Sequence, residues 1–165
     1  SFKMKNLFQC LFIFVVISCS KDDDTYSSTA LEVNVISDNT INLSEELVLE
    51  IEVKNADSLF ALSLELHYSS NIFEANSPAV SNGNLFSDPF NHELLSTGEI
   101  GVALGEQGNV QSISSGIACQ ITLLPKIVGT DWLYVSSLHM IQSNGTSIEG
   151  FSSLTIEPIE VNVVE

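Results

Sequence analysis

The chain has 165 residues and is strongly acidic, with 21 Asp and Glu residues against 5 Lys and Arg and a formal net charge of −16 at pH 7. This balance excludes nucleic acids and anionic membrane surfaces as partners of the bare protein surface, because proteins bind phosphate groups mainly through Lys and Arg. The length allows one domain core and is too short for two ordinary domains.

An export signal is predicted at residues 1–18. Lys3 and Lys5 provide a positive start, and residues 7–17 form an almost continuous apolar run. A helix of about eleven residues is too short to cross roughly 30 Å of hydrocarbon, so the run fits the apolar segment of a signal peptide. The alternatives to the lipoprotein signal described next are an ordinary cleaved signal peptide and an uncleaved apolar helix.

The apolar run ends in Val16-Ile17-Ser18-Cys19, which resembles the lipobox of bacterial lipoproteins. The resemblance implies that Cys19 is acylated and becomes the N-terminus of the mature protein. Two or three acyl chains form a firm membrane anchor, whereas a single chain binds only marginally.

Residues 20–24, Ser-Lys-Asp-Asp-Asp, resemble the acidic signal that some Gram-negative bacteria use to export lipoproteins to the outer face of the outer membrane. The resemblance implies an outer-membrane lipoprotein exposed at the cell surface, and a solvated linker is the alternative interpretation of the charges. We expect residues 19–29 to be an acylated, acidic and Ser-rich tether, and residues 30–165 to form one domain.

Cysteine usage provides no disulfide framework. Cys10 leaves with the signal peptide and Cys19 is acylated, which leaves Cys119 alone in an apolar stretch. We expect the Cys119 thiol to behave as a small core residue, and no thiol-ligated metal site is predicted.

From residue 30 onward, apolar and polar residues alternate almost everywhere, and no segment shows the 3.6-residue period of an amphipathic helix. Gly, Pro and Asn-Gly turn signals separate the alternating segments. Strands are expected at residues 31–35, 47–53, 61–68, 72–74, 92–95, 99–104, 117–124, 133–140 and around 161–163. About nine short strands with these turns predict an all-β fold, an antiparallel β-sandwich or jelly roll.

Four stretches carry a family resemblance. They are Leu-Phe-Ala-Leu-Ser-Leu-Glu-Leu-His-Tyr-Ser-Ser-Asn-Ile-Phe-Glu at 59–74, Gly-Glu-Ile-Gly-Val-Ala-Leu-Gly-Glu at 98–106, Ser-Ile-Ser-Ser-Gly-Ile-Ala-Cys-Gln-Ile-Thr at 112–122, and alternating residues from Gly129 to Asn144-Gly145. In this order and spacing they resemble the cohesin module, a cellulosome scaffold domain that shares its nine-stranded fold with some cellulose-binding modules. The resemblance covers roughly residues 30–164.

The resemblance implies a non-catalytic module that binds the dockerin modules of polysaccharide-degrading enzymes through the outer face of one sheet. In cohesins, an asparagine and an aspartate of this face correspond to Ala61 and Ser63, and a tyrosine corresponds to Leu94. Glu106 keeps the glutamate that closes the sixth strand. Most of the polar contact set is therefore replaced, which argues against dockerin recognition of the best-known type.

The single tryptophan indicates a binding surface. If Leu133 and Val135 face the core, alternation places Trp132 and Tyr134 outward, and the cohesin-like strand order places both rings beside the third strand. Paired aromatic rings next to small side chains fit either a sugar-stacking platform or a protein-binding hot spot. The alternative is that a loop at residues 82–90 covers the rings.

The predicted ligand- or partner-binding face consists of Trp132, Tyr134, Ala61, Ser63, Glu65, His67, Leu94 and Glu106. Its two glutamates, Glu65 and Glu106, are expected at the polar edge. The sequence leaves three functions open, namely polysaccharide binding, docking of a dockerin-like protein module, and a structural or adhesion role in a surface assembly.

No catalytic motif or metal site is predicted. His67, His92 and His139 are isolated in sequence, and no nucleophile elbow, phosphate loop or zinc motif is present. The chain is therefore interpreted as a binding protein without a cofactor rather than an enzyme. Calcium held by the acid-rich turns at 37–39 and 106–107 is the one alternative, because calcium takes oxygen ligands.

Overall fold

The computed structural model describes residues 32–108, 113–148 and 156–165. The predicted signal peptide, Cys19 and the tether lie outside the described residues. Within these ranges, no helix has the length and apolar character needed to cross a membrane. The described strands are β1 (Glu32–Ile36), β2 (Thr40–Asn42), β3 (Leu47–Asp57), β4 (Leu59–His67), β5 (Phe73–Glu74), β6 (Val80–Asn82), β7 (Pro89–Ser96), β8 (Glu99–Glu106), β9 (Ile113–Pro125), β10 (Gly129–Gln142) and β11 (Ile159–Val164).

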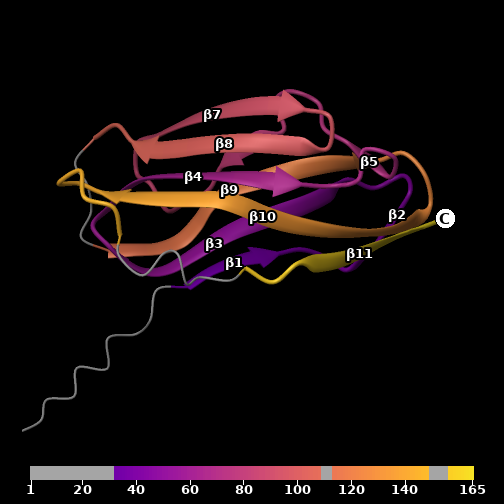
Figure 1. The fold of residues 1–165 in the computed structure, drawn as a ribbon, viewed down its shortest axis with the longest axis horizontal. Coiled ribbons are helices and arrows are strands. Elements are labelled where there is room, and N and C mark those ends of the chain that lie inside the picture. The colour runs from indigo at the N-terminus through magenta and orange to yellow at the C-terminus, as the bar shows by residue number, and fades with distance from the viewer. Residues whose placement is uncertain (1–31, 109–112, 149–155) are drawn as a thin grey trace, which may run out of the picture.

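The strands form two sheets that pack face to face (Figure 1). The five-stranded sheet has the order β1-β3-β9-β5, with β6 also paired to β9. The six-stranded sheet has the order β2-β11-β10-β4-β8-β7. This arrangement confirms the predicted all-β sandwich, with one difference. The pairing of β2 with β11 is parallel, not antiparallel, because β2 reaches the sheet by crossing from β1 in the other layer.

Strand alternation explains the core. Leu62, Leu64 and Leu66 of β4 are buried between the sheets, as are Ile51 of β3 and Ile121 of β9 from the opposite layer. Apolar area removed from water stabilises a fold by about 25 cal/mol per Å², so two facing rows of such side chains hold the sheets together. The strand predicted at residues 61–68 is confirmed, and its three leucines are the inward residues.

The predicted strands are all present, and two short ones were missed. β2 and β6 have only three residues each, too few to show alternation. The prediction for Val135 is only partly right, because its side chain is half-buried rather than fully buried. Val135 directly precedes a β-bulge between Ser136 and His139, where β10 bends and its pairing with β4 shifts by one residue.

Cys119 lies on β9 and is fully buried as a free thiol. Burial raises the pKa of this thiol to about 12, because the apolar surroundings disfavour a thiolate. The expected role as a small core residue is confirmed, and a protonated thiol of this kind is inert.

A half-buried carboxylate on the edge strand β7 links the two sheets. Glu93 of β7 accepts hydrogen bonds from the backbone N–H groups of Ala79 and Val80, each at 2.8 Å, and from the Ser77 hydroxyl. Burial alone would raise the pKa of Glu93, but these hydrogen bonds outweigh it and keep the pKa below its ordinary value. The carboxylate thereby fixes the start of β6 against β7.

Replacing Leu66 by Ala tests the packing. Leu66 is fully enclosed between the sheets, so truncation should lower the free energy of unfolding by about 2–5 kcal/mol through lost burial and an internal cavity. Leu94→Ala is the matched control, because Leu94 points into solvent and should shift stability by less than about 0.5 kcal/mol. Urea denaturation measures both, and equal losses in the two variants would contradict the assigned strand faces.

Candidate functional site

The candidate site is the outer face of the six-stranded sheet. Alternation that turns Leu62, Leu64 and Leu66 inward turns the intervening residues of β4 outward. The pairing of β4 with β8 and β10, and of β8 with β7, then places the outward residues of four strands next to one another. From β7 to β10 the outward residues are Phe90, His92 and Leu94, then Gly101, Ala103 and Gly105, then Ala61, Ser63, Glu65 and His67, and finally Ile141, His139, Tyr134 and Trp132.

Small side chains hollow this face along β8 and β4. One hollow of about 390 Å³ runs between His92 and Leu94 on one side and Ser137 and His139 on the other. A second hollow of about 200 Å³, almost entirely apolar, continues it over Ala61 and is bordered by Phe90 and Ile141. Both share Ser63, Ala103 and His139 as lining residues, so we describe them together as the trough.

Two aromatic rings stand beyond the trough on β10. Trp132 is 57% exposed and Tyr134 is 48% exposed, so neither ring is covered by the loop at residues 82–90. The His67 ring stacks on Tyr134, with centroids 4.5 Å apart and an interplanar angle of 11°. One face of the Tyr134 ring is therefore occupied, while Trp132 remains open.

The predicted neighbours of these rings, Ala61, Ser63, Glu65 and His67, are only partly right. Tyr134 pairs with His67 across the ladder, and Trp132 pairs with Glu160 of β11 rather than with any residue of β4. Ala61 and Ser63 instead pair with Ile141 and His139, at the other end of β10. The reason is the antiparallel register, which brings the start of β10 to the end of β4. Sequence alternation fixes the face of a residue but not its partner.

A hydrogen-bond network joins the trough to the aromatic end. Glu65 accepts hydrogen bonds from the hydroxyls of Ser137 (2.6 Å) and Ser136 (3.2 Å), and His67 Nε2 lies 2.7 Å from Ser136 Oγ. The bonds from Ser137 and Ser136, aided by nearby His67, lower the pKa of Glu65 despite its partial desolvation. Ser137 has a left-handed backbone (φ 51°) and lies in the bulge of β10. The hydrogen bonds from Ser136 and Ser137 to Glu65 hold this bulge in place.

Comparisons with known proteins bear on the fold. No protein-family model matches the chain, and no curated protein sequence matches it. Solved structures do match. A non-cellulosomal cohesin from the hyperthermophilic archaeon Archaeoglobus fulgidus aligns with a TM-score of 0.65 at 14% identity, over 82% of this chain and 91% of that one. The domain has the cohesin fold.

Two further matches come from bacteria. The cohesin module of a family 33 glycoside hydrolase from Clostridium perfringens aligns with a TM-score of 0.65 at 13% identity, over 81% of this chain and 96% of that one. The sixth cohesin of scaffoldin B from Acetivibrio cellulolyticus, solved in complex with the Cel5 dockerin, gives a TM-score of 0.65 at 13% identity, over 82% of this chain and all of that one. At such identities the likeness establishes a cohesin-like fold.

Glu106 of this cohesin-like domain is not at the edge of the binding face, contrary to the prediction. It shares the inward side of β8 with Ile100, Val102 and Leu104, and it is only 3% exposed. Its carboxylate accepts hydrogen bonds from the backbone N–H groups of Ser87 (2.7 Å), Asp88 (2.9 Å) and Gly108 (3.1 Å), and from the Ser87 hydroxyl. Glu106 therefore fastens the loop that precedes β7. The alternation along β8 indicates this inward position, because Glu106 has the same parity as Ile100, Val102 and Leu104.

Glu106, His67 and Cys119, three residues considered for metal or catalytic chemistry, have other contacts in the structure. Within the described ranges, no three His, Cys, Asp or Glu residues are grouped closely enough to hold a metal ion. The Glu106 carboxylate already serves four hydrogen-bond donors, so the proposed calcium turn at 106–107 lacks an available carboxylate. His67 is engaged by Tyr134 and Ser136, and Cys119 is a buried thiol, so neither is placed as a nucleophile.

The structure adds face residues that sequence reasoning missed. Phe90, His92, His139 and Ile141 form the walls of the trough, and the Phe90 ring packs over Gly105, where a Cβ atom would overlap it. Of the predicted residues, the sheet brings together Ala61, Ser63, Glu65, His67, Leu94, Trp132 and Tyr134. For the wall on β7, the position of His92 and Leu94 on one face of the predicted hairpin strand is the sequence signal that indicates it.

Glu106→Gln tests the loop anchor through pH. Burial opposes the charged form of Glu106, but the hydrogen bonds from Ser87, Gly108 and Asp88 outweigh it and keep the pKa below 4.5. A lowered folded-state pKa contributes stability above the ordinary value and loses it as pH falls through the folded value. The variant should therefore melt at a lower temperature than the native chain at neutral pH, and the gap should close below pH 4.5.

Thermal melts across this pH range, with Glu46→Gln as the control, measure the effect. Glu46 is exposed and accepts no hydrogen bond within the described residues, so its replacement should leave the melting curve unchanged at every pH. A gap between native chain and Glu106→Gln that stays constant with pH would contradict the assignment.

Proposed function

We propose that this chain is a non-catalytic docking module that binds a helical surface of a partner protein in the trough and over Trp132. The observation that carries the proposal is the exposed apolar surface of one sheet face. Leu94 is 68% exposed and Trp132 is 57% exposed, and the apolar trough lies between their strands. Soluble proteins seldom expose such surface without a ligand or partner for it.

The dimensions of the trough suit a helix. Its walls rise from β7 and β10, which are separated by β8 and β4, a distance of three strand spacings or about 14 Å. An α-helix with its side chains is about 10–12 Å across. The small side chains of Ser63 and Ala103 on the floor let a helix approach the sheet closely, as in helix-in-groove recognition.

Charge defines the polar part of the partner. The aromatic end of the face carries Glu65, Glu99 and Glu160, and neither of the described lysines, Lys54 and Lys126, lies on this sheet. A partner with an apolar helix face and basic residues beyond it fits both regions. Complementary charge of this kind mainly increases the association rate and fixes the orientation of the partner.

A dockerin-like module is the partner class that we propose. Cohesins of the same fold have been solved in complex with dockerins, which supports this choice. Ala61, Ser63 and Leu94 replace a polar contact set with small or apolar groups, so the partner is expected to use apolar anchors where other dockerins use hydrogen bonds. The setting would be the assembly of polysaccharide-degrading proteins.

Polysaccharide capture on the same face has weaker support. On this face His67 covers one side of the Tyr134 ring, so the two rings do not both offer an open face for a polysaccharide to lie on. An exposed aromatic anchor such as Trp132 also fits a protein hot spot, where one residue contributes much of the binding energy.

Display at the cell surface is part of the proposal and rests on the sequence. The lipobox-like Val16-Ile17-Ser18-Cys19 and the acidic residues 20–24 support an outer-membrane lipoprotein whose tether holds the domain away from the bilayer. A surface anchor would let the module recruit a secreted partner to the cell.

Trp132→Ala tests the face. The variant should weaken binding of purified dockerin modules by about 2 kcal/mol, or roughly 30-fold, because an exposed aromatic anchor is lost. Its melting temperature should stay nearly unchanged, because the ring is exposed. Isothermal titration gives the affinity, and Leu94→Glu should weaken binding through the opposite wall.

Val48→Ala is the matched control for this test. Val48 is also an exposed apolar residue, but it lies on β3 of the other sheet, so its removal should leave the affinity unchanged. Absence of binding to every dockerin tested would refute the dockerin assignment and favour a structural or adhesion role. Binding that Val48→Ala weakens and Trp132→Ala does not would refute the face.

Cys19→Ala tests the anchor. Loss of the acylated sulfur should leave the chain unprocessed or released in soluble form, because the acidic domain has no affinity of its own for an anionic membrane. Mass spectrometry of the membrane-extracted native protein should show acyl chains on Cys19. An unmodified Cys19 on a mature protein free of the membrane would contradict the lipoprotein assignment.

A further inference from the structure

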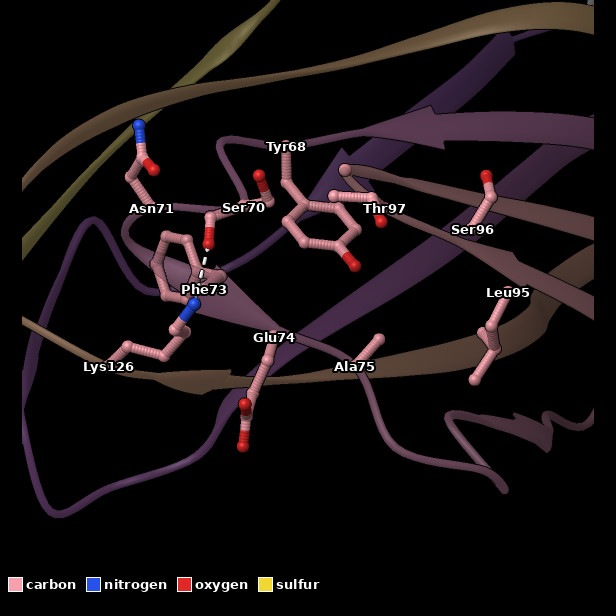
Figure 2. Close-up of a pocket in the computed structure, with 11 residues that line it drawn as sticks. Tyr68, Ser70, Asn71, Phe73, Glu74, Ala75, Leu95, Ser96, Thr97 and Lys126 are labelled. Atoms are coloured by element: carbon pink, nitrogen blue, oxygen red, sulfur yellow. Dashed lines mark hydrogen bonds between the residues drawn. The ribbon is translucent and has the colours of Figure 1, made fainter.

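A second hollow lies at one end of the sandwich, away from the trough. It has a volume of about 570 Å³, within the range of about 300–1,000 Å³ that small-molecule sites occupy. Three parts of the chain border this open hollow, namely the stretch from the end of β4 through β5, the end of β7 with its turn to β8, and the residue after β9. Its lining residues are Tyr68, Ser70, Asn71, Phe73, Glu74, Ala75, Leu95, Ser96, Thr97, Gly98 and Lys126 (Figure 2).

Hydrogen bonds between these segments give the hollow a fixed shape. The Tyr68 N–H donates to the Gly98 carbonyl (3.0 Å), and the Lys126 N–H donates to the Ile72 carbonyl (2.7 Å). The Lys126 ammonium donates to the Ser70 carbonyl at 2.8 Å. Walls that are already joined to one another need little ordering when a ligand binds, which favours binding.

The lining divides into an apolar part and a polar part. Ala75 and Leu95 supply apolar surface above the buried Phe73, and Figure 2 shows the Tyr68 ring between the Lys126–Glu74 side and the Thr97–Ser96 side. The side chains of Asn71, Glu74 and Thr97 make no hydrogen bond within the described residues. The polar groups of these three side chains are therefore available to a ligand of the hollow.

The charges select the chemistry of the ligand. A free anion would meet Glu74 in a chain of net charge −16, and a simple cation would meet the Lys126 ammonium. A neutral ligand rich in hydroxyl groups fits both, because hydroxyls donate to a carboxylate and accept from an ammonium group. Such a ligand also needs one apolar side to lie against Tyr68 and Leu95. Pyranose sugars combine these properties.

We propose that this end hollow is a binding site for one neutral sugar residue, held against Tyr68 with its hydroxyls at Asn71, Glu74 and Lys126. The site is separate from the trough and does not depend on the docking function. Together they would let one module hold a partner protein and contact a glycan at the same time.

The test uses the native acylated protein, solubilised in detergent, and ligand-observed saturation-transfer NMR with glucose, galactose, mannose and xylose. At least one of these sugars should bind, and glucuronate and glucosamine, which carry a charge, should bind more weakly. Asn71→Ala and Glu74→Ala should each reduce the affinity about tenfold, because each removes hydrogen bonds to the sugar. Both side chains are exposed, so the melting temperature should not change.

Trp132→Ala is the control that separates the two faces. It should leave sugar binding unchanged while weakening dockerin binding, so failure of one proposal does not imply failure of the other. No saturation transfer to any of the four neutral sugars would overturn the proposal. Sugar binding that Trp132→Ala abolishes, or that Asn71→Ala and Glu74→Ala leave intact, would also overturn it.

Discussion

Packing of the two sheets against each other determines which side of every strand faces water. Each inward side chain, such as Leu64 of β4 or Ile121 of β9, excludes water from the space between the layers, and the two-residue period of a strand then places its neighbours on the outside. The binding face is therefore a consequence of the core. Ser63 and Glu65 face solvent because burial of Leu62, Leu64 and Leu66 turns the alternate residues of β4 outward.

The same constraint explains why the trough exists. A sheet normally covers its outer face with polar side chains, but β8 and β4 carry Gly101, Ala103, Ala61 and Ser63 there. Longer side chains on β7 and β10 stand above this low strip. Bonds from Ser136 and Ser137 to Glu65 hold the bulge of β10, so the wall formed by His139 keeps its position. Side-chain size determines the shape of the trough. Its preference for a basic partner follows from the charge of this sheet, which carries glutamates and, among the described residues, no lysine.

Alternation in the sequence was enough to predict the sandwich, the core of β4 and the outward direction of Trp132 and Tyr134. It was not enough to predict register, which depends on turns and bulges distributed along the chain. His67 is a neighbour of Tyr134 as predicted, whereas Trp132 pairs with Glu160 of β11 and lies away from Ala61 and Ser63. Glu106 was misplaced for a different reason. The family resemblance implies an edge position for Glu106, whereas the inward parity that it shares with Leu104 implies burial. Its bonds to the loop at Ser87 depend on tertiary contacts that no local pattern shows.

The central claim is that a helical protein module binds the outer face of the six-stranded sheet. Chemical-shift mapping of the ¹⁵N-labelled chain during titration with a purified dockerin module tests it most directly, because every backbone amide reports its own environment. The account predicts shifts concentrated on β7, β8, β4 and β10, with the indole N–H of Trp132 among the most affected. Shifts concentrated on β1, β3 and β9 of the opposite sheet would contradict it.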